Sequence, residues 1–505
     1  MTGPSVLEIE RKFDVEEGTA LPRLKDLPGV AGVDKPVVYR LEAEYFDTGD
    51  LRLSSQQITL RRRTGGKDAG WHLKLHAAPG ERREYHEPLG QDADGVPAPL
   101  LRLVRVHVRD SALVVVARLS TLRTVHHLRN KGGDVLAEFS DDKVHAETLI
   151  PRQSSQHWRE WELELIAGSR KLLDAGQDLM AAAGVTPAQH SSKLARALGK
   201  NLPDTTQTLA PKPKGPAGDV LLAYLHEQLH ALTEQDPLVR LDAEDAVHRM
   251  RVATRRMRSA LATYGKLLKD TEAVRFLRDE LKWLAGVLGE ARDAEVMHGR
   301  LKEMIANEPE ELVLGPVARR VDIELGADYQ QAHDRVLEAL DSQRYFHLVE
   351  TLGSFLAAPG LTKQGTQPAR KVIPKLVRRD IKRLRSAVQE AKNHPAGTGD
   401  HPALHEARKD GKRLRYAAEA ASPVAPKRAS RLADAAHGVQ KLLGDHQDSL
   451  VTRSVLRRLG AESFVQGENG FSYGRLHALE ESVALEAERR FHCEWKNFPS
   501  VSLAK

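Results

Sequence analysis

The sequence contains a single cysteine, Cys493, few aromatic residues and no long apolar run. One cysteine excludes a disulfide-stabilised scaffold and a Cys-rich zinc site, because each needs several thiols. The longest apolar run, Ala112–Ala117, is far too short to cross a bilayer. Residues Met1–Glu10 also lack the basic-then-apolar pattern of a secretory signal. We therefore expect a cytoplasmic protein with no membrane partner.

The sequence also lacks a large excess of positive or negative charge. The chain carries 76 Lys and Arg against 70 Asp and Glu, a formal net charge of +6 over 505 residues. Bulk charge therefore does not indicate a nucleic-acid-binding protein. The sequence also lacks a GxxxxGK(S/T) phosphate-binding loop, so a P-loop mechanism is not supported. Any anion site must arise from the positions of individual charges.

The chain has two halves with different periodicities. Residues 1 to about 200 form short alternating runs separated by Gly, Pro, Asp and Asn, which predict many antiparallel strands and a closed barrel. Two helical stretches, Lys171–Ala183 and Lys193–Leu198, follow the last strand. The expected strands are Val6–Phe13, Tyr39–Phe46, Ile58–Arg63, Trp71–Leu75, Leu113–Leu119, Arg123–Leu128, Val135–Phe139 and Glu160–Ile166.

A proline-rich stretch at residues 203–217 reads as a linker, and from residue 218 to 505 the period is helical. This half repeats itself: Ala246–Leu261 aligns with Ala403–Ala418, about 155 residues apart, and Leu288–Asp293 aligns with Leu443–Asp448 at the same spacing. The repeat predicts two helical bundles, at about 218–358 and 369–505.

Charged residues recur two positions apart on several of the expected strands. Side chains two apart point to the same face, so each pair shares a face. Burial of the apolar face would place these charges outside a barrel, whereas the separation of acidic and basic strands favours a charged lumen. Both arrangements remain open at this point. The sets are Glu8, Glu10 and Lys12; Arg61 and Arg63; His72 and Lys74; and Glu162 and Glu164.

The same residues resemble a known family. Glu8-x-Glu10-x-Lys12 looks like the signature of the CYTH superfamily, the triphosphate tunnel metalloenzymes. The resemblance covers residues 5–200, and further matches follow in the order of the family. They are Tyr45-Phe46-Asp47-Thr48, Leu60–Arg63 with Trp71–Lys74, Arg123 with Arg118 as a weaker candidate, Glu138 and Asp142, Glu162-Leu-Glu164, and Ser191-Ser-Lys193.

The resemblance implies an eight-stranded antiparallel tunnel at residues 1–202 that binds a triphosphate with Mg²⁺ or Mn²⁺. The overall class is then α+β, with an all-α domain of two four-helix bundles behind the tunnel. The implied catalytic residues are Lys12, Glu162 and Glu164. The implied phosphate-binding residues are Arg61, Arg63, Lys74, Arg118, Arg123 and Lys193. The implied metal ligands are Glu8, Glu10, Glu138, Asp142, Glu162 and Glu164.

The substrate within this family is less determined. Members act on inorganic triphosphate, thiamine triphosphate or RNA ends, or cyclise ATP. An organic group would need an aromatic platform, and we expect the candidates Tyr45 and Trp71 to lie in the outer core. Inorganic triphosphate is therefore the expected substrate, with thiamine triphosphate or ATP as alternatives.

Each copy of the helical repeat carries a stripe of basic residues along one helix face. Aligned like charges repel, so the stripes need either acidic partners or an anionic ligand, and their recurrence favours the ligand. A further stripe, Arg378, Lys382 and Arg385, has no clear equivalent in the other copy. The paired stripes are His248, Arg251, Arg255 and Arg258, and His405, Arg408, Lys412 and Arg415.

This half resembles the CHAD domain, the conserved histidine α-helical domain that often follows CYTH. The match rests on Val247-His-x-x-Arg-Val-x-x-Arg-Arg-x-Arg258 and on Leu288-Gly with Asp293, while Gly411 and Lys412 depart from the pattern. It implies two four-helix bundles around a basic groove that binds inorganic polyphosphate, with the residues of the paired stripes and Arg378, Lys382 and Arg385 as the expected binding residues. Nucleic acid is not the expected partner, because no aromatic residue interleaves with the stripes to stack bases. The alternative is a non-catalytic protein that targets polyphosphate granules.

Overall fold

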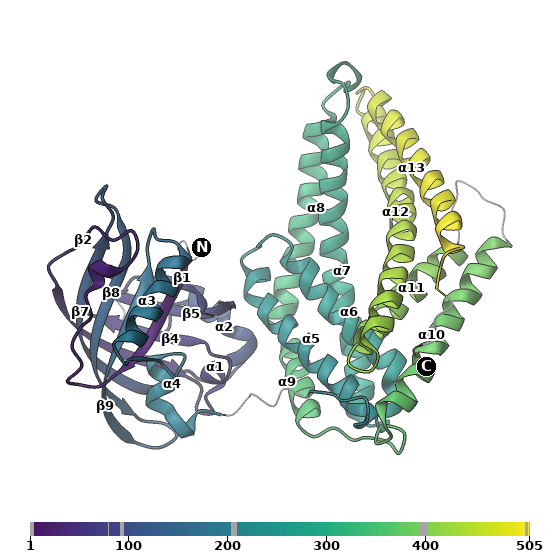
Figure 1. Ribbon diagram of the computed structural model, residues 1–505. Helices are drawn as coiled ribbons and strands as arrows, with labels where there is room; N and C mark the ends of the chain where they lie inside the picture. The colour runs from purple at the N-terminus through teal and green to yellow at the C-terminus, as the bar shows by residue number, and fades with distance from the viewer. Residues whose placement is uncertain are drawn as a thin grey trace. The chain divides into compact units, whose positions relative to one another are not determined.

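The computed structural model describes residues 5–78, 80–90, 95–203, 210–393, 402–499 and 503. It divides into two compact units, Met1–Gln207 and Thr208–Lys505 (Figure 1). The first is a β barrel with short helices, and the second is built from α-helices. The two periodicities of the sequence correspond to these two architectures.

Eight long antiparallel strands close the barrel in the order β1-β6-β5-β4-β3-β7-β8-β9, with β9 pairing back to β1. Closure leaves no long exposed edge. Two short strands, β2 (Gly32–Val33) and β10 (Thr186–Pro187), pair with β7 and β1. The predicted eight-stranded tunnel is confirmed. Its strands are β1 (Val6–Val15), β3 (Val37–Asp47), β4 (Thr59–Thr64), β5 (Gly70–Ala78), β6 (Glu81–Glu87), β7 (Val114–Arg129), β8 (Val135–Thr148) and β9 (Ser154–Leu165).

Two of the sequence assignments within the barrel were wrong. The expected strands Leu113–Leu119 and Arg123–Leu128 are one continuous strand, β7, because no glycine or proline interrupts Ser120–Leu122. Strand β6 was missed because its sequence ERREYHE has polar residues on both faces, with Tyr85 its only buried residue. Hydrophobic alternation cannot detect such a strand.

The apolar core of this unit lies largely outside the barrel wall. Helix α3 (Arg170–Ala182) packs against β1 and β9 and covers their outward side chains, including Phe13, Trp161 and Leu163. These residues alternate with the charged residues of the same strands, which therefore face inward. The apolar face is buried by a helix instead of by the lumen, and the lumen is free to be polar.

Helix α4 (Lys193–Leu198) fills one end of the barrel. Its Leu194, Ala197 and Leu198 pack in a buried cluster with lumen-facing residues such as Leu119 and Val144. The Ser192 hydroxyl accepts a hydrogen bond from the Ala195 N–H and caps the helix. The helix therefore begins at the border between an apolar plug and the charged part of the lumen.

The second unit contains two helical bundles related by the sequence repeat. Helices α5–α8 form one and α10–α13 the other, and α6 packs against α11 between them. An additional helix, α9, packs on α5, α7 and α8. No described helix is both long and apolar enough to cross a membrane. The helices are α5 (Ala217–Arg240), α6 (Ala246–Tyr264), α7 (Glu272–Ala306), α8 (Val317–Leu340), α9 (Gln343–Ala357), α10 (Ala369–Lys392), α11 (Pro402–Ala420), α12 (Pro426–Val465) and α13 (Phe471–Trp495).

Part of the expected linker is fixed to the helical unit. The N–H of Ala369 donates to the Gly215 carbonyl at 2.8 Å, and the N–H of Arg370 donates to the Pro213 carbonyl at 2.9 Å. These bonds also satisfy backbone donors at the start of α10. Residues 204–209 of the expected linker lie outside the described residues.

The close approach of α3 to β9 makes a stability prediction. A Cβ atom at Gly176 would overlap the Leu163 side chain, so Gly176→Ala should destabilise the first unit by about 1–3 kcal/mol. A Cβ atom at Gly286 of α7 meets nothing within 4 Å, so Gly286→Ala should stabilise the helical unit by up to about 1 kcal/mol. Chemical denaturation of both variants measures these changes. Stabilisation by Gly176→Ala would contradict the α3–β9 packing.

Candidate functional site

Strand register gathers carboxylates on one wall of the lumen. Residues directly opposite each other on paired strands point to the same side of the sheet. Glu164 of β9 lies opposite Glu10 of β1 on one side and Glu138 of β8 on the other. Glu162 lies in the same way between Lys12 and Ser140. The paired charges of these strands, for which the sequence left both a lumen-facing and an outward arrangement open, therefore face the lumen.

The opposite wall is mainly basic. Arg61 of β4 lies between Tyr45 of β3 and His72 of β5. Arg63 follows two residues later and is 5% exposed. The Nε atoms of Arg61 and Arg63 are buried without a hydrogen-bond partner among the described residues. Buried guanidinium N–H groups without acceptors need an anion or water from elsewhere.

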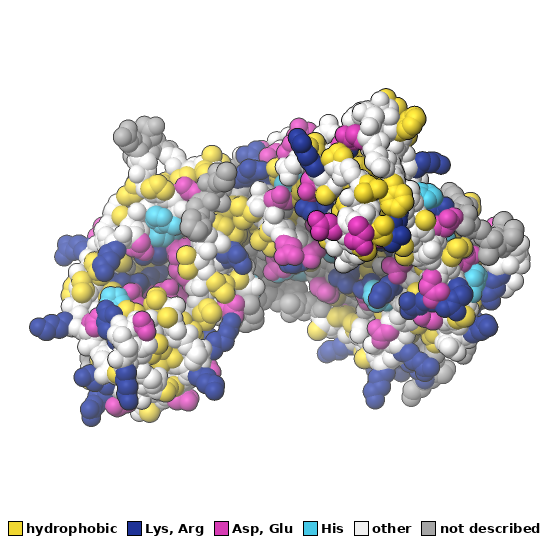
Figure 2. Space-filling view, turned by 90° about the horizontal axis from the view of Figure 1, so that it is seen from above, with side chains coloured by type: hydrophobic (Ala, Val, Ile, Leu, Met, Phe, Trp, Pro, Cys, Tyr) yellow, Lys and Arg dark blue, Asp and Glu magenta, His cyan; other side chains and the backbone are white. Residues whose placement is uncertain are grey.

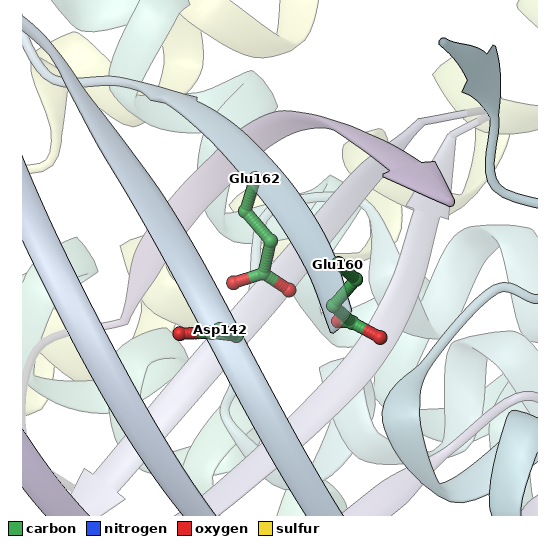
Figure 3. A group of neighbouring side chains, drawn as sticks. All are labelled: Asp142, Glu160 and Glu162. Atoms are coloured by element: carbon green, nitrogen blue, oxygen red, sulfur yellow. The ribbon is translucent and has the colours of Figure 1, made fainter. Parts of the chain in front are cut away.

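A buried acidic triad lies on β8 and β9. One carboxylate oxygen each of Asp142, Glu160 and Glu162 falls within 4.8 Å of the others, and Figure 3 shows the three side chains close together on neighbouring strands. Such a group could hold a metal ion. The ammonium of Lys193 lies among them, with Nζ 2.9 Å from Asp142, 2.7 Å from Glu160 and 2.8 Å from Glu162. Cationic charge is therefore already supplied to the triad by α4.

The ion pairs of Glu162 extend this network to two further cations. Lys12 Nζ lies 2.7 Å from Glu162, and Arg123 contacts both Glu162 and Asp142. Burial alone would raise the pKa of Glu162, but the surrounding cations outweigh burial and hold that pKa well below its ordinary value. Glu162 is thus ionised and fixed in position at neutral pH.

For the neighbouring carboxylates Glu164 and Glu8, attraction to Lys74 does not outweigh burial. Glu164 makes no hydrogen bond or ion pair with any residue in the described ranges, and burial is the main cause that raises its pKa to about 7. Repulsion from Glu10 and Glu138 adds to the rise. Burial likewise raises the pKa of Glu8 to about 8, although Lys74 Nζ lies 2.5 Å from Glu8. Carboxylates that repel one another in a buried site fit a hard divalent cation with oxygen ligands.

The structure adds lumen residues that the sequence analysis missed. Glu160 lies two positions before Glu162, so the period of two could have identified it. Glu84 contacts His72 at 2.8 Å and Lys74 at 3.8 Å, but it lies on the strand that was overlooked. Burial is the main cause that lowers the pKa of His72 to about 4, so this ring is neutral at neutral pH.

Three expectations on the barrel can now be compared with the geometry. Tyr45 was expected in the outer core, but it faces the lumen and its hydroxyl lies 3.4 Å from Arg61. Trp71 does lie outside, with its ring 4.9 Å from that of Phe46. Arg118 does not reach the lumen: it is 56% exposed and pairs with Glu44 at 3.1 Å on the outer face. The odd-numbered positions of β7, which include Arg123, face inward, and Arg118 is even-numbered.

In the helical unit, the two repeats build matching ion pairs. Arg251 of α6 pairs with Asp293 of α7 at 3.2 Å, and Arg408 of α11 pairs with Asp448 of α12 at 3.3 Å. Each arginine also lies against a glycine: a Cβ at Gly289 would be 3.6 Å from Arg251 Nε, and one at Gly444 would be 3.7 Å from the Arg408 guanidinium. The glycines leave space for the arginines to lie along the partner helix.

The remaining stripe residues are less well neutralised. Arg255, Arg258 and Lys412 make no hydrogen bond or ion pair within the described part of the chain. Burial lowers the pKa of Lys412 to about 6, and the charges of Arg255 and Arg408 lower it further. Because Arg255 belongs to α6 and Lys412 to α11, the two stripes meet. We call the eight residues of the paired stripes the α6–α11 patch.

The edges of the patch are held by polar neighbours. His405 Nδ1 lies 3.1 Å from the Gln447 side chain, and Arg415 pairs with Glu419 at 2.9 Å. Tyr416 does interleave with the stripes, contrary to expectation, since the guanidiniums of Arg415 and Arg256 each lie 5.8 Å from its ring. With 4% exposure, however, this ring offers no surface for stacking a base.

The third stripe lies elsewhere. Asp380 of α10 is buried against α6 and α11, accepting a hydrogen bond from Thr263 at 2.6 Å and pairing with Arg413 at 3.0 Å. Arg378, Lys382 and Arg385 project from the opposite, exposed face of α10. The structure therefore does not bring them together with the α6–α11 patch.

Comparisons with known proteins agree with this division. Residues 7–198 match the CYTH domain model, and residues 223–457 match the CHAD domain model. Domains of the CYTH family are metal-dependent and are typically enzymes acting on phosphate-containing substrates. CHAD domains are associated with phosphate compounds such as polyphosphate.

An uncharacterised protein of Mycobacterium tuberculosis (strain CDC 1551) is 41% identical over 494 residues, covering 95% of this chain and 93% of the relative. PptA from Streptomyces chartreusis aligns over 56% of this chain and 99% of its own, with 22% identity and a TM-score of 0.46. The CHAD domain from the plant Ricinus communis aligns over 60% and 98%, with 21% identity and a TM-score of 0.47. The chain belongs to the proteins in which a CYTH domain is followed by a CHAD domain.

Proposed function

We propose that the tunnel hydrolyses inorganic triphosphate to diphosphate and phosphate with Mg²⁺ or Mn²⁺. One observation carries the proposal: carboxylates from β1, β8 and β9 and cations from β4, β5, β7 and α4 face a single closed lumen. A linear polyanion can lie along the basic wall while the acidic wall binds a divalent cation. Phosphoryl transfer requires little more than this positioning and charge neutralisation.

The acidic wall supplies the metal ligands in this proposal. Glu10, Glu138 and Glu164 would hold the cation, because they are adjacent in register and Glu164 makes no ion pair with a described residue. Glu8 lies on the same face of β1 and would complete the set. When bound, the cation would neutralise phosphate charge as the terminal phosphoryl group is transferred.

The basic wall binds and orients the substrate. Arg61 and Arg63 would donate their free Nε–H groups to phosphate oxygens, and Lys74 and Arg123 would neutralise further charge. Water attacks the terminal phosphorus atom, the bridging P–O bond breaks, and diphosphate leaves with the electron pair. Lys12, held 3.2 Å from Glu10 and 2.7 Å from Glu162, would stabilise the negative charge as it develops.

Paired variants of adjacent arginines test the tunnel. Arg61 faces the lumen, whereas Arg62 faces outward and binds Glu44 at 2.7 Å. Arg61→Ala should lower kcat/KM for triphosphate by about 10²–10³-fold, because it removes a charge-assisted contact to the transferred group. Arg62→Ala should retain the wild-type rate. Metal-dependent phosphate release measures both, and equal losses in the two variants would place the substrate outside the lumen.

We also propose that the α6–α11 patch binds inorganic polyphosphate and so brings the enzyme to polyphosphate granules. The patch combines three cations without acidic partners with two arginines whose Nε atoms are buried and unsatisfied in the described structure. Polyphosphate carries closely spaced charge and no bases, so it needs no stacking surface. The exposed face of the patch offers none.

Salt dependence tests this assignment. Arg251→Ala combined with Arg408→Ala removes the matching arginines of both repeats and should weaken polyphosphate binding. The slope of log K against log salt should fall by about two, because roughly one phosphate contact is lost per arginine. The control is Arg249→Ala with Lys409→Ala, which removes two exposed charges from the same helices. An unchanged slope in the patch variant would return Arg251 and Arg408 to a structural role.

The lysine of the patch makes the binding pH-dependent. Free Lys412, with a pKa of about 6, is mostly neutral at pH 7.5, and a bound polyanion raises that pKa. Polyphosphate affinity should therefore increase as pH falls from 8 to 6, by up to about tenfold per pH unit. Lys412→Arg keeps the charge at every pH and should flatten this dependence. Polyphosphate binding of the wild type and of Lys412→Arg is measured across this pH range. The difference between the two pH dependences gives the contribution of Lys412, because His248 and His405 are present in both proteins.

A further inference from the structure

The two repeats differ most in their first helices. Helix α5 contains one basic residue, Arg240, and four acidic ones, whereas α10 contains nine Lys and Arg and only two acidic residues, Asp380 and Glu390. Both helices pack on the same kind of bundle, so packing alone does not require the cations of α10. Their presence in one copy only points to a role specific to that helix.

The exposed cations of α10 form one continuous stripe. They occur at i, i+4, i+7, i+11 and i+14, which places them along one face over roughly 21 Å at 1.5 Å per residue. No acidic residue interrupts this face of the helix. The stripe, which we call the α10 stripe, consists of Lys371, Lys375, Arg378, Lys382 and Arg385, all exposed.

Acidic partners within the described structure do not account for the three lysines of this stripe. Lys371, Lys375 and Lys382 make no ion pair with any described residue, and the near acid of α10, Asp380, is directed at Arg413 and Thr263. Acidic and basic side chains lie interspersed over much of the face that Figure 2 draws. A one-sign stripe is self-repelling and is relieved by binding an anion.

We propose that the α10 stripe is a second polyphosphate-binding surface, separate from the α6–α11 patch, and that together they select long chains. This rests on the proposed polyphosphate binding by the patch. The stripe lies on the face of α10 opposite Asp380, which contacts α6 and α11, so one short chain cannot cover both surfaces. A chain long enough to reach both gains avidity, because its second contact is intramolecular.

The composition of the stripe favours polyphosphate over nucleic acid. The five positions of the stripe carry only Lys and Arg, and this face of α10, which continues to the exposed Gln389, carries no aromatic side chain to stack a base. Its ligand is therefore recognised by charge density alone.

The test compares short and long polyphosphate on the full-length protein. The variant Lys371→Gln with Lys375→Gln and Lys382→Gln removes three exposed lysines and should fold normally. It should bind a short chain as the wild type does, but bind a long chain about tenfold more weakly or worse. The matched control, Lys266→Gln with Lys282→Gln and Lys302→Gln, removes the same charge from exposed positions near α7 and should bind both chains normally.

The proposal would be overturned if the α10 variant bound long polyphosphate as tightly as the wild type, or if the control variant lost as much affinity for long polyphosphate as the α10 variant. It would also be overturned if the α10 variant lost affinity only for duplex DNA, tested as a competitor of polyphosphate. Failure of the underlying function has a different signature. In that case the short chain would bind equally to the wild type and to Arg251→Ala with Arg408→Ala. Thermal unfolding of each variant verifies that the fold is intact.

Discussion

The structure of the first unit depends on burying opposite charges inside a closed barrel. Removing carboxylates and ammonium groups from water is costly, and here the cost is offset by contacts such as those of Lys193 with three carboxylates at 2.7–2.9 Å. The barrel can hold this network because the apolar residues of β1 and β9 pack outward, under α3, and the apolar residues inside the barrel are gathered at the end that α4 fills. A site of this kind is organised before any ligand arrives, which is what phosphoryl transfer demands of a protein.

Much of the tunnel was predictable because strands alternate faces. Once Glu8, Glu10 and Lys12 share a side, the period of two fixes the rest of the strand, and the ordered matches on the other strands supply the remaining wall. The alternation alone could not predict whether the charged face points into the lumen or to solvent, since this depends on α3 covering Trp161 and Leu163 on the other face. Glu84 escaped because its strand has no apolar alternation, and Arg118 was misplaced because the expected break in β7 hid its parity relative to Arg123.

The helical unit shows what duplication preserves and what it alters. The pairs Arg251–Asp293 and Arg408–Asp448 agree within 0.1 Å, at 3.2 and 3.3 Å, and each is accompanied by its glycine. Sequence spacing alone revealed these equivalences, because it is the same in both copies. The α10 stripe has no such counterpart on α5, and its separation from the patch follows from tertiary contacts of Asp380 that no spacing rule could supply.

The position of α4 affects how a ligand can enter the lumen of the barrel. Leu194, Ala197 and Leu198 pack with lumen-facing apolar residues at one end of the barrel. A highly charged polymer that passed through the barrel from end to end would have to cross this apolar layer, which is costly. A long polyphosphate chain can therefore insert only its end into the lumen, whereas a molecule about as long as the lumen can be enclosed completely.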